Sequence, residues 1–292
     1  MIPKPPSPSL ALQTLSHHPD AKSANAVPRA VVAFARTDRA GHVIARHSHE
    51  RDQLVYAIKG VMSIEALNTV WTIPPSYGLW IPATVEHSVR MDTEVEMRTL
   101  YISSGVVPFP DNECQVRAIS PLLRELIIRA VTISPLYDEY GPDGRLMQVI
   151  VDEIAQQVSA PLGLRFPSDK RLAELCQHVL DHLGESEPIG RLGSRVGLSE
   201  RSVMRLFPQQ TGMTFHAWRQ QARLMRAFSL AEQNRPLGLI ASELGYSSSA
   251  AFAKMFRRVF GASPRILLRA TQGASVGSWK GRPWDDQHQG GV

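Results

Sequence analysis

The chain has 292 residues, and 43% of them are hydrophobic, which is typical of a globular protein and excludes wholesale disorder. Its two cysteines are too few for a disulfide scaffold, and we find neither the ~18-residue apolar run of a membrane span nor the apolar core of a signal peptide. We therefore expect a cytoplasmic protein with no membrane partner.

The net charge of +5 is unevenly distributed along the chain. Residues 168–270 contain 15 Lys/Arg against 8 Asp/Glu, whereas residues 1–167 contain 15 against 17. This asymmetry predicts that only the C-terminal half contacts a polyanion.

The N-terminal half is expected to be a flexible arm followed by a β-domain. Residues 1–28 are rich in proline and serine, which favours the arm. Residues 29–110 then contain short runs of valine, isoleucine and aromatic residues between turn residues, namely "AVVAFA", "LVYAIKG", "VMSIEAL", "TVWTI" and "VEMRTLYI". Many short strands without intervening helices predict a barrel or a sandwich.

Two helices are expected within residues 118–160. The first spans 120–131, with Ser120 as its N-cap and Pro121 at its first position, and the second spans 144–158. Their apolar faces can pack on the β-domain or pair with a second subunit, and the sequence leaves both alternatives open. The stretch "SAPLGLRFPSD" that follows is typical of an interdomain linker.

From residue 168 to 271 the periodicity is entirely helical. It predicts helices over 169–183, 189–197, 200–210, 214–234, 237–244, 249–260 and 264–270. Capping residues precede them, namely Ser168, Ser199, Thr214, Ser247 or Ser248, and Ser263. The Gly-rich residues 272–292 are expected to form a flexible tail.

One pattern occurs twice in this half. "IGRLGSRVGLSERSVMRLFPQQTGMT" begins at Ile189, and "LGLIASELGYSSSAAFAKMFRRVFGASP" begins at Leu237. Each has a short helix that ends at a glycine, a turn, and a second helix, which is the helix-turn-helix arrangement that places its second helix in the DNA major groove.

These residues resemble the DNA-binding domain of the AraC/XylS family of bacterial transcription regulators, and the resemblance covers roughly residues 168–270. "LGYSSSAAFAKMFRRVFGASP" resembles the family signature almost throughout, with small departures at Pro208 and Gly238. The resemblance implies two helix-turn-helix units, joined by one long helix, that read adjacent major-groove segments roughly 34 Å apart on double-stranded DNA. It also implies a homodimer on direct or inverted repeats, with RNA polymerase as a further partner.

The motif positions of the family imply which side chains face the bases. They are Arg201, Met204 and Arg205 in the first unit, and Ser249, Ala250, Ala253 and Lys254 in the second. Arg201 and Arg205 are four residues apart on one helical face and can each pair with a guanine. The second set is chemically poorer, so we expect it to anchor more than to discriminate. Arg257 and Arg258 are candidates for phosphate contacts, and the alternative for every exposed arginine is simple solvation.

The β-domain resembles the cupin-like sensor barrel of such regulators. "GHVIARHSHERDQLVYAIKG" keeps the spacing of the first cupin metal motif, with Gln53 in place of glutamate, and "GLWIPATVEHSVRM" is a weaker second motif. The candidate constellation is His47, His49, Gln53 and His87. It can hold a divalent metal, but it lacks the anionic ligand; the same groups can also bind a small-molecule effector or serve only as internal hydrogen-bonding groups.

The sequence therefore predicts an α+β multidomain protein, with a cupin-like β-barrel, trailing helices, and an all-α domain with two helix-turn-helix units. Its predicted function is sequence-specific transcription regulation controlled by a small effector, without enzyme activity and without a certain cofactor. Two alternatives remain. One is a metal-dependent cupin enzyme fused to a DNA-binding domain, and the other is a constitutive DNA-binding protein whose barrel serves only dimerisation.

Overall fold

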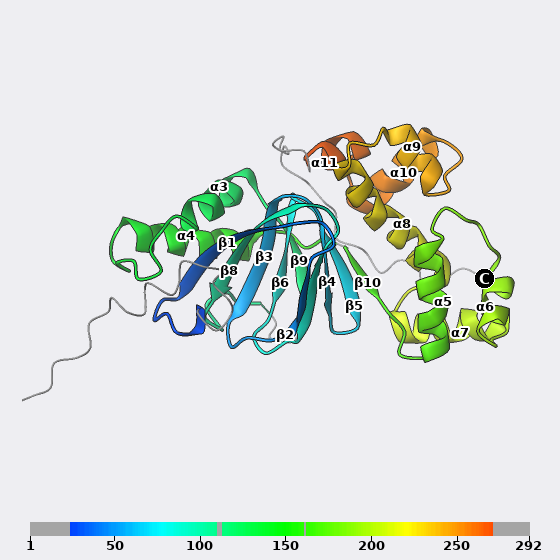
Figure 1. Ribbon diagram of the computed structural model, residues 1–292, viewed down its shortest axis with the longest axis horizontal. Coiled ribbons are helices and arrows are strands. Elements are labelled where there is room, and N and C mark those ends of the chain that lie inside the picture. Colours follow the sequence, from blue (N-terminus) through cyan, green and yellow to red (C-terminus); the bar gives the residue numbers. More distant parts are fainter. Residues whose placement is uncertain (1–23, 110–112, 161, 271–292) are drawn as a thin grey trace, which may run out of the picture.

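The computed structural model describes residues 24–109, 113–160 and 162–270. It has an antiparallel β-domain in its N-terminal part and a helical C-terminal part, and two further helices lie on the far side of the β-domain (Figure 1). The α+β class and the order of the two parts are as predicted. The expected tail at 272–292 and most of the expected arm, residues 1–23, lie outside the described residues.

The β-domain consists of two five-stranded antiparallel sheets. The first sheet has the order β1 (Val31–Asp38), β8 (Val95–Ile102), β3 (Asp52–Lys59), β6 (Tyr77–Ile81) and β9 (Gln115–Ala118). The second has the order β10 (Gly163–Arg165), β5 (Thr69–Ile73), β4 (Met62–Ala66), β7 (His87–Met91) and β2 (Val43–His47).

Strand alternation divides the side chains of β3 between two cores. Val55 and Ala57 pack into the core that contains the interior residues of both sheets, such as Ile64 of β4. Leu54 and Tyr56 belong to a second core on the outer face of the first sheet. This division follows from strand geometry, because successive side chains of a strand point to opposite faces.

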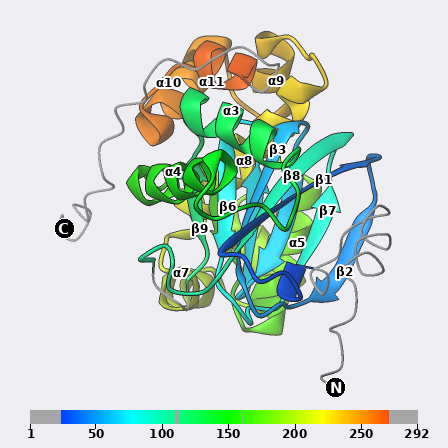
Figure 2. The same cartoon turned by 90° about the vertical axis from the view of Figure 1, so that its left-hand side faces the viewer.

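Helices α3 (Pro121–Ala130) and α4 (Pro142–Gln156) cover that outer face (Figure 2). Leu123 and Ile127 of α3 and Ile150 of α4 are fully buried in the second core, together with Trp80 of β6. Ser120 caps α3 by accepting a hydrogen bond from the Leu123 amide, as predicted. Of the two alternatives that the sequence left open, packing on the β-domain is the one observed for these apolar faces.

The described end of the expected arm and part of the expected linker are packed against the β-domain. In the expected arm, Ala24 and Val27 are buried against the β-domain, and Arg51 donates to the Val27 carbonyl at 2.6 Å. In the expected linker, β10 pairs with β5 and extends the second sheet. Both segments are packed because their backbone and side-chain partners are distant in sequence.

The helical part contains α5 (Lys170–Asp181), α6 (Ile189–Arg195), α7 (Glu200–Thr211), α8 (Phe215–Glu232), α9 (Leu237–Glu243), α10 (Ser249–Phe260) and α11 (Pro264–Ala270). Each lies within about two residues of its predicted range. Ser199, Thr214 and Ser248 each accept the capping hydrogen bond of their helix. Asp169 rather than Ser168 caps α5, because its carboxylate accepts from the Arg171 amide.

Helix α8 connects the helical part to the β-domain. Its Trp218 indole donates to the Arg165 carbonyl at 2.9 Å, and its Gln221 amide donates to the Gly163 carbonyl at 2.5 Å, both on β10. Near the other end of α8, the Glu232 carboxylate accepts from the Gly60 amide at 3.1 Å. Within the described ranges, we find no helix long and apolar enough to cross a membrane.

Candidate nucleic-acid interface and histidine cluster

Each helix-turn-helix unit turns at a glycine. Gly197 follows α6 with φ +70°, and Gly245 follows α9 with φ +74°. Residues with a Cβ are disfavoured at such φ values, so the glycines permit the tight turn between the two helices of each unit. The second helices, α7 and α10, then begin at capped N-termini, at Ser199 and Ser248.

Aromatic cores hold the two second helices in place. In the first unit, the Phe207 ring is fully buried, with its centroid 5.4 Å from that of Phe215 and 5.8 Å from that of Trp218. In the second unit, Phe228 of α8 packs against Phe256 and Phe260 at 5.7 and 5.5 Å. Because α8 contributes to both cores, it fixes the two units to one shared element.

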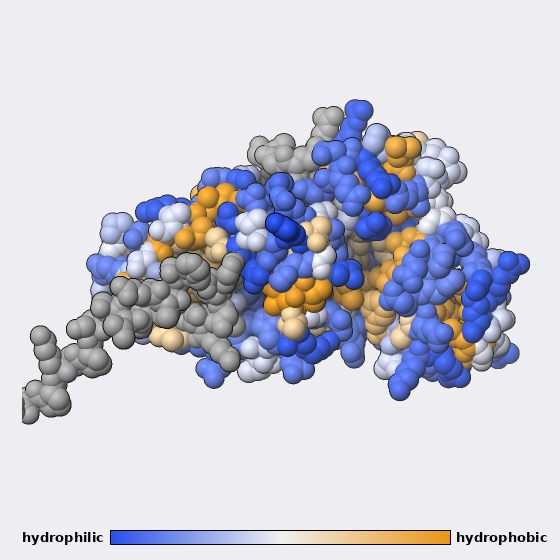
Figure 3. Space-filling view, viewed as in Figure 1, coloured by the Kyte–Doolittle hydropathy of each residue, from blue (hydrophilic) through white to orange (hydrophobic). Residues whose placement is uncertain are grey.

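The opposite face of α7 is exposed. Arg201 and Arg205 are exposed, and Met204, which lies between them on the same face, is 61% exposed. These three side chains leave this face of α7 available for contact with a partner surface. On the face shown in Figure 3, hydrophilic residues cover most of the helical part, with smaller apolar patches between them.

The corresponding face of α10 is exposed but has fewer side chains that can form hydrogen bonds. Ser249, Ala250 and Lys254 are exposed, and Ala253 is half-buried. Arg257 is exposed at the end of the same face. Arg258 lies on the flank instead, where its guanidinium donates to the Gln220 carbonyl oxygen of α8 at 3.1 Å. The structure thus places six of the seven candidate base-contacting residues in solvent.

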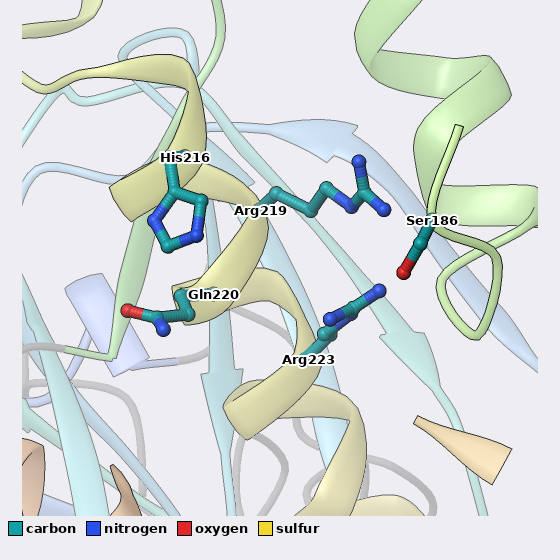
Figure 4. Close-up of a pocket in the computed structure, with 5 residues that line it drawn as sticks. All are labelled: Ser186, His216, Arg219, Gln220 and Arg223. Carbon is teal, nitrogen blue, oxygen red and sulfur yellow. The ribbon is translucent and has the colours of Figure 1, made fainter. Parts of the chain in front are cut away.

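The sequence analysis missed a group of donors on α8. His216, Arg219, Gln220 and Arg223 line a pocket together with Ser186 (Figure 4). Their spacing of three, four and seven residues places them on one helical face. The signal was present in the sequence, but any solvated helix face shows the same pattern.

Three histidines of the β-domain are brought together at the ends of β2 and β7. The ring centroids are 4.3 Å apart for His47 and His87, 5.1 Å for His49 and His87, and 6.1 Å for His47 and His49. His87 is fully buried and His49 nearly so, whereas His47 is half-buried. The sequence analysis grouped these histidines correctly, although it did not predict strands β2 and β7.

Backbone carbonyls orient all three rings through Nδ1. The Nδ1 atoms of His47, His49 and His87 lie 2.9, 2.5 and 2.9 Å from the carbonyl oxygens of Ala45, Arg51 and Val85. A carbonyl accepts only a hydrogen, so neutral His47 and His87 carry their proton on Nδ1 and leave Nε2 as an acceptor, whereas both ring nitrogens of His49 face oxygens. Burial lowers the pKa of His49, and burial lowers the pKa of His87 to about 4, so both rings are neutral near pH 7.

The Nε2 atoms of the two buried rings have different surroundings. Nε2 of His49 is 2.9 Å from the Gln53 side-chain amide, whose other end contacts the Thr99 hydroxyl at 2.8 Å. The Gln53 side-chain oxygen faces Nε2 of His49, and the Gln53 NH₂ group donates to the Thr99 hydroxyl. Nε2 of His87 is buried and has no hydrogen-bond partner among the described residues.

As arranged, this set does not fit a divalent cation. Nδ1 contacts to carbonyls are the outer contacts that metal-binding histidines make. However, the four side chains carry no negative charge, and the Gln53 amide is bound to His49 and Thr99. Among the described residues, no three histidine, cysteine, aspartate or glutamate side chains are placed to hold one ion.

Comparisons with known proteins agree with this architecture. Residues 192–270 match a family model described as a helix-turn-helix domain, and residues 30–148 match one described as an AraC-like ligand binding domain. The first matched segment runs from within α6 to the end of α11, and the second runs from just before β1 into α4.

Individual relatives match most of this chain or about a third of it. The chain is 32% identical over 226 residues to the HTH-type transcriptional regulator NimR of Escherichia coli (strain K12), which covers 77% of this chain and 82% of that protein. It is 33% identical over 104 residues to the arabinose operon regulatory protein of the same strain, covering 35% and 36%. A solved AraC-type DNA-binding domain from Chromobacterium violaceum is 30% identical and covers 38% of this chain and 97% of that one, with a TM-score of 0.35.

The two matched models and the double helix-turn-helix arrangement define a DNA-binding regulator with a ligand-binding domain. The chain belongs to the AraC family of transcriptional regulators. Its relatives are regulators rather than enzymes.

Proposed function

We propose that this chain is a cytoplasmic regulator whose affinity for DNA is controlled by a small molecule bound at the histidine cluster. The observation that carries the proposal is the Nε2 atom of His87, a buried acceptor beside two other imidazoles. Leaving a buried polar atom unpaired costs about 1–3 kcal/mol. A ligand that donates a hydrogen bond to this atom recovers that cost.

A ligand can shift the protein only by binding one arrangement better than another. The chain provides a route for this coupling through neighbouring strands. His87 lies on β7, which pairs with β4; β4 pairs with β5, and β5 pairs with β10, whose carbonyls hold α8. Because α8 contributes to the cores of both helix-turn-helix units, a shift of β10 changes how the two units are presented to DNA.

On DNA, we propose that Arg201 and Arg205 contact bases from α7. Ser249, Ala250, Ala253 and Lys254 anchor α10, and Arg257 and Arg258 contact phosphates. Exposure of the α7 face supports this assignment, because bidentate pairing with guanine requires a guanidinium that no other protein group occupies. Arg258 has to leave Gln220 to reach a phosphate.

We propose a homodimer formed through α3 and α4. These helices bury one face on the β-domain, yet Leu122 is 54% exposed and Val149 is 43% exposed. Exposed aliphatic residues on neighbouring helices suit a second copy of the chain. RNA polymerase is the further partner proposed for activation.

Titration of small molecules while operator affinity is measured tests the proposed control. We expect a hydrogen-bond-donating ligand to change the affinity of the wild type but not of His87→Phe. Metal content of the wild type against His47→Ala is measured in parallel, and equal content is expected. If no compound or metal changes the affinity, the β-domain serves only dimerisation and the proposal fails.

A further inference from the structure

The pocket on α8 is lined only by hydrogen-bond donors and neutral polar groups. Its volume is ≈ 260 Å³, and its lining side chains are two guanidiniums, an imidazole, an amide and a hydroxyl. In Figure 4, Arg219 and Arg223 extend from α8 toward Ser186 on the loop between α5 and α6. No carboxylate lines the pocket.

Backbone carbonyls, not carboxylates, hold both guanidiniums. Arg219 donates to the Glu187 carbonyl at 3.1 Å and to the Glu185 carbonyl. Arg223 donates to the carbonyls of Leu183 and Glu185 at 2.7 and 3.0 Å. Among the described residues, neither arginine forms an ion pair. Carbonyl contacts fix the two groups without a direct ion pair, and the Tyr246 ring lies 5.9 Å from the guanidinium carbon of Arg223.

The charge of Glu187 acts on Arg219, but its carboxylate pairs directly with other side chains. The Glu187 carboxylate lies 3.2 Å from Arg195 and 3.5 Å from His178. Burial lowers the pKa of Arg219 and of Arg223, and the charge of Arg223 lowers that of Arg219 further. Two half-buried cations one helical turn apart repel each other, so an anion between them stabilises the site.

The pocket lies where the two helix-turn-helix units meet. A Cβ at Gly184 would collide with the Glu243 carbonyl, so the α5–α6 loop directly contacts the end of α9 in the second unit. On the other side, Gln220 binds Arg258 of α10. Ser186 is three residues before α6, the helix that crosses the DNA backbone in this motif.

From this arrangement, we propose that the pocket of Ser186, His216, Arg219, Gln220 and Arg223 binds a phosphate group. Arginine forks match the oxygens of a phosphate, and Ser186 and His216 add donors at the edge. The position between the two units favours a phosphate of the DNA backbone over a free phosphate. The assignment to a DNA backbone phosphate rests on the proposed function, whereas binding of a phosphate group by the pocket does not depend on it.

Two substitutions of nearly identical shape test this. Ser186 is exposed, so Ser186→Asp and Ser186→Asn should both fold, and only the first adds a negative charge to the pocket. Full-length proteins are compared in DNA affinity at several salt concentrations. We expect Ser186→Asp to bind about tenfold more weakly than Ser186→Asn, with a salt dependence shallower by about one phosphate contact.

Thermal unfolding without DNA gives a second readout. The added carboxylate pairs with the two arginines, so Ser186→Asp should have a higher Tm than Ser186→Asn, whereas a merely damaged loop would lower it. Inorganic phosphate is then tested against chloride at equal ionic strength. A Tm increase by phosphate in Ser186→Asn but not in Ser186→Asp identifies a free phosphate as an occupant.

The outcomes distinguish a DNA backbone phosphate from a free phosphate, and they distinguish failure of the pocket proposal from failure of the proposed function. A difference between the variants in DNA binding assigns the backbone phosphate, and a difference only with inorganic phosphate assigns the free anion. Equal behaviour of the two variants in both arms overturns the pocket proposal. Failure of the wild type to bind any DNA sequence preferentially defeats the proposed function instead, whatever the variants do with inorganic phosphate.

Discussion

The two parts of the molecule direct their polar chemistry in opposite directions. In the β-domain, His49, Gln53 and His87 are buried and contact each other or backbone carbonyls. In the helical part, Arg201, Arg205 and Lys254 are exposed on the outer faces of α7 and α10. Buried polar side chains suit a small ligand that the domain encloses, whereas exposed polar side chains suit a large partner surface such as a DNA groove. A regulator needs both, and α8 and β10 connect them.

If this division is correct, variants of inward residues should change stability or ligand response, and variants of outward residues should change DNA binding alone.

The largest expected effect is Phe256→Ala, which removes a fully buried ring from the core of the second helix-turn-helix unit. We expect the free energy of unfolding to fall by about 3–5 kcal/mol. Chemical denaturation measures it. Met204→Ala, which shortens an exposed side chain, is the control and should be nearly neutral; an equal loss would contradict the assignment of core and surface.

A smaller effect is expected from the pH dependence of stability. Burial and, to a smaller extent, the charges of His47, His49 and Arg46 together lower the pKa of His87 from 6.5 to about 4. The unfolded chain therefore binds a proton between these pH values while the folded chain does not. The stabilisation is complete above pH 6.5 and is lost as the pH falls through 4, by about 3 kcal/mol for this one group.

His87→Gln should flatten this part of the profile. Denaturant unfolding between pH 7 and 4 provides the measurement. The same slope in His87→Gln and in the wild type would show that the buried imidazole does not cause the acid sensitivity.

Arg205→Ala tests the outward face of α7. We expect specific affinity to fall by about 1–3 kcal/mol, with relaxed selectivity at one base pair and an unchanged Tm. Competition binding with operator and random DNA measures the specific affinity and the selectivity. Gln209→Ala, one turn further along the same helix, is the matched control, and an equal loss in both variants would argue against base contact by Arg205.

The smallest effect is expected on α10. Lys254→Ala should weaken binding by less than about 1 kcal/mol, equally for operator and random DNA, and should reduce the salt slope by about one unit. Selective loss of operator binding would show that α10 reads bases and that the contrast between the two helices is wrong.

Local signals explain which elements the sequence predicted well. The helices of the C-terminal part have regular apolar spacing and capping residues such as Ser199 and Ser248, and their ranges were predicted closely. Strands β2 and β10 are short and lie at sheet edges, and they exist because β7 and β5 provide hydrogen-bond partners. Their own residues are compatible with a loop, so a pattern in one segment cannot reveal them.

The sites show the same limit. The histidines were grouped by motif spacing, but the carbonyl contacts that fix their tautomers depend on tertiary structure. The donors of the α8 pocket were missed because Ser186 joins them only through the packing of the α5–α6 loop. Spacing along a chain predicts which residues share a face, but it does not predict what faces them.

Genome-wide binding of the purified full-length protein to fragmented chromosomal DNA tests the central claim most directly, with wild type and Arg205→Ala compared side by side. We predict a small set of sites that share a sequence motif in the wild type, with two segments roughly 34 Å apart. The Arg205→Ala variant should bind the same sites more weakly, and its motif should be degenerate at one position. Binding without any shared sequence, or an identical motif and strength for both proteins, would contradict the account.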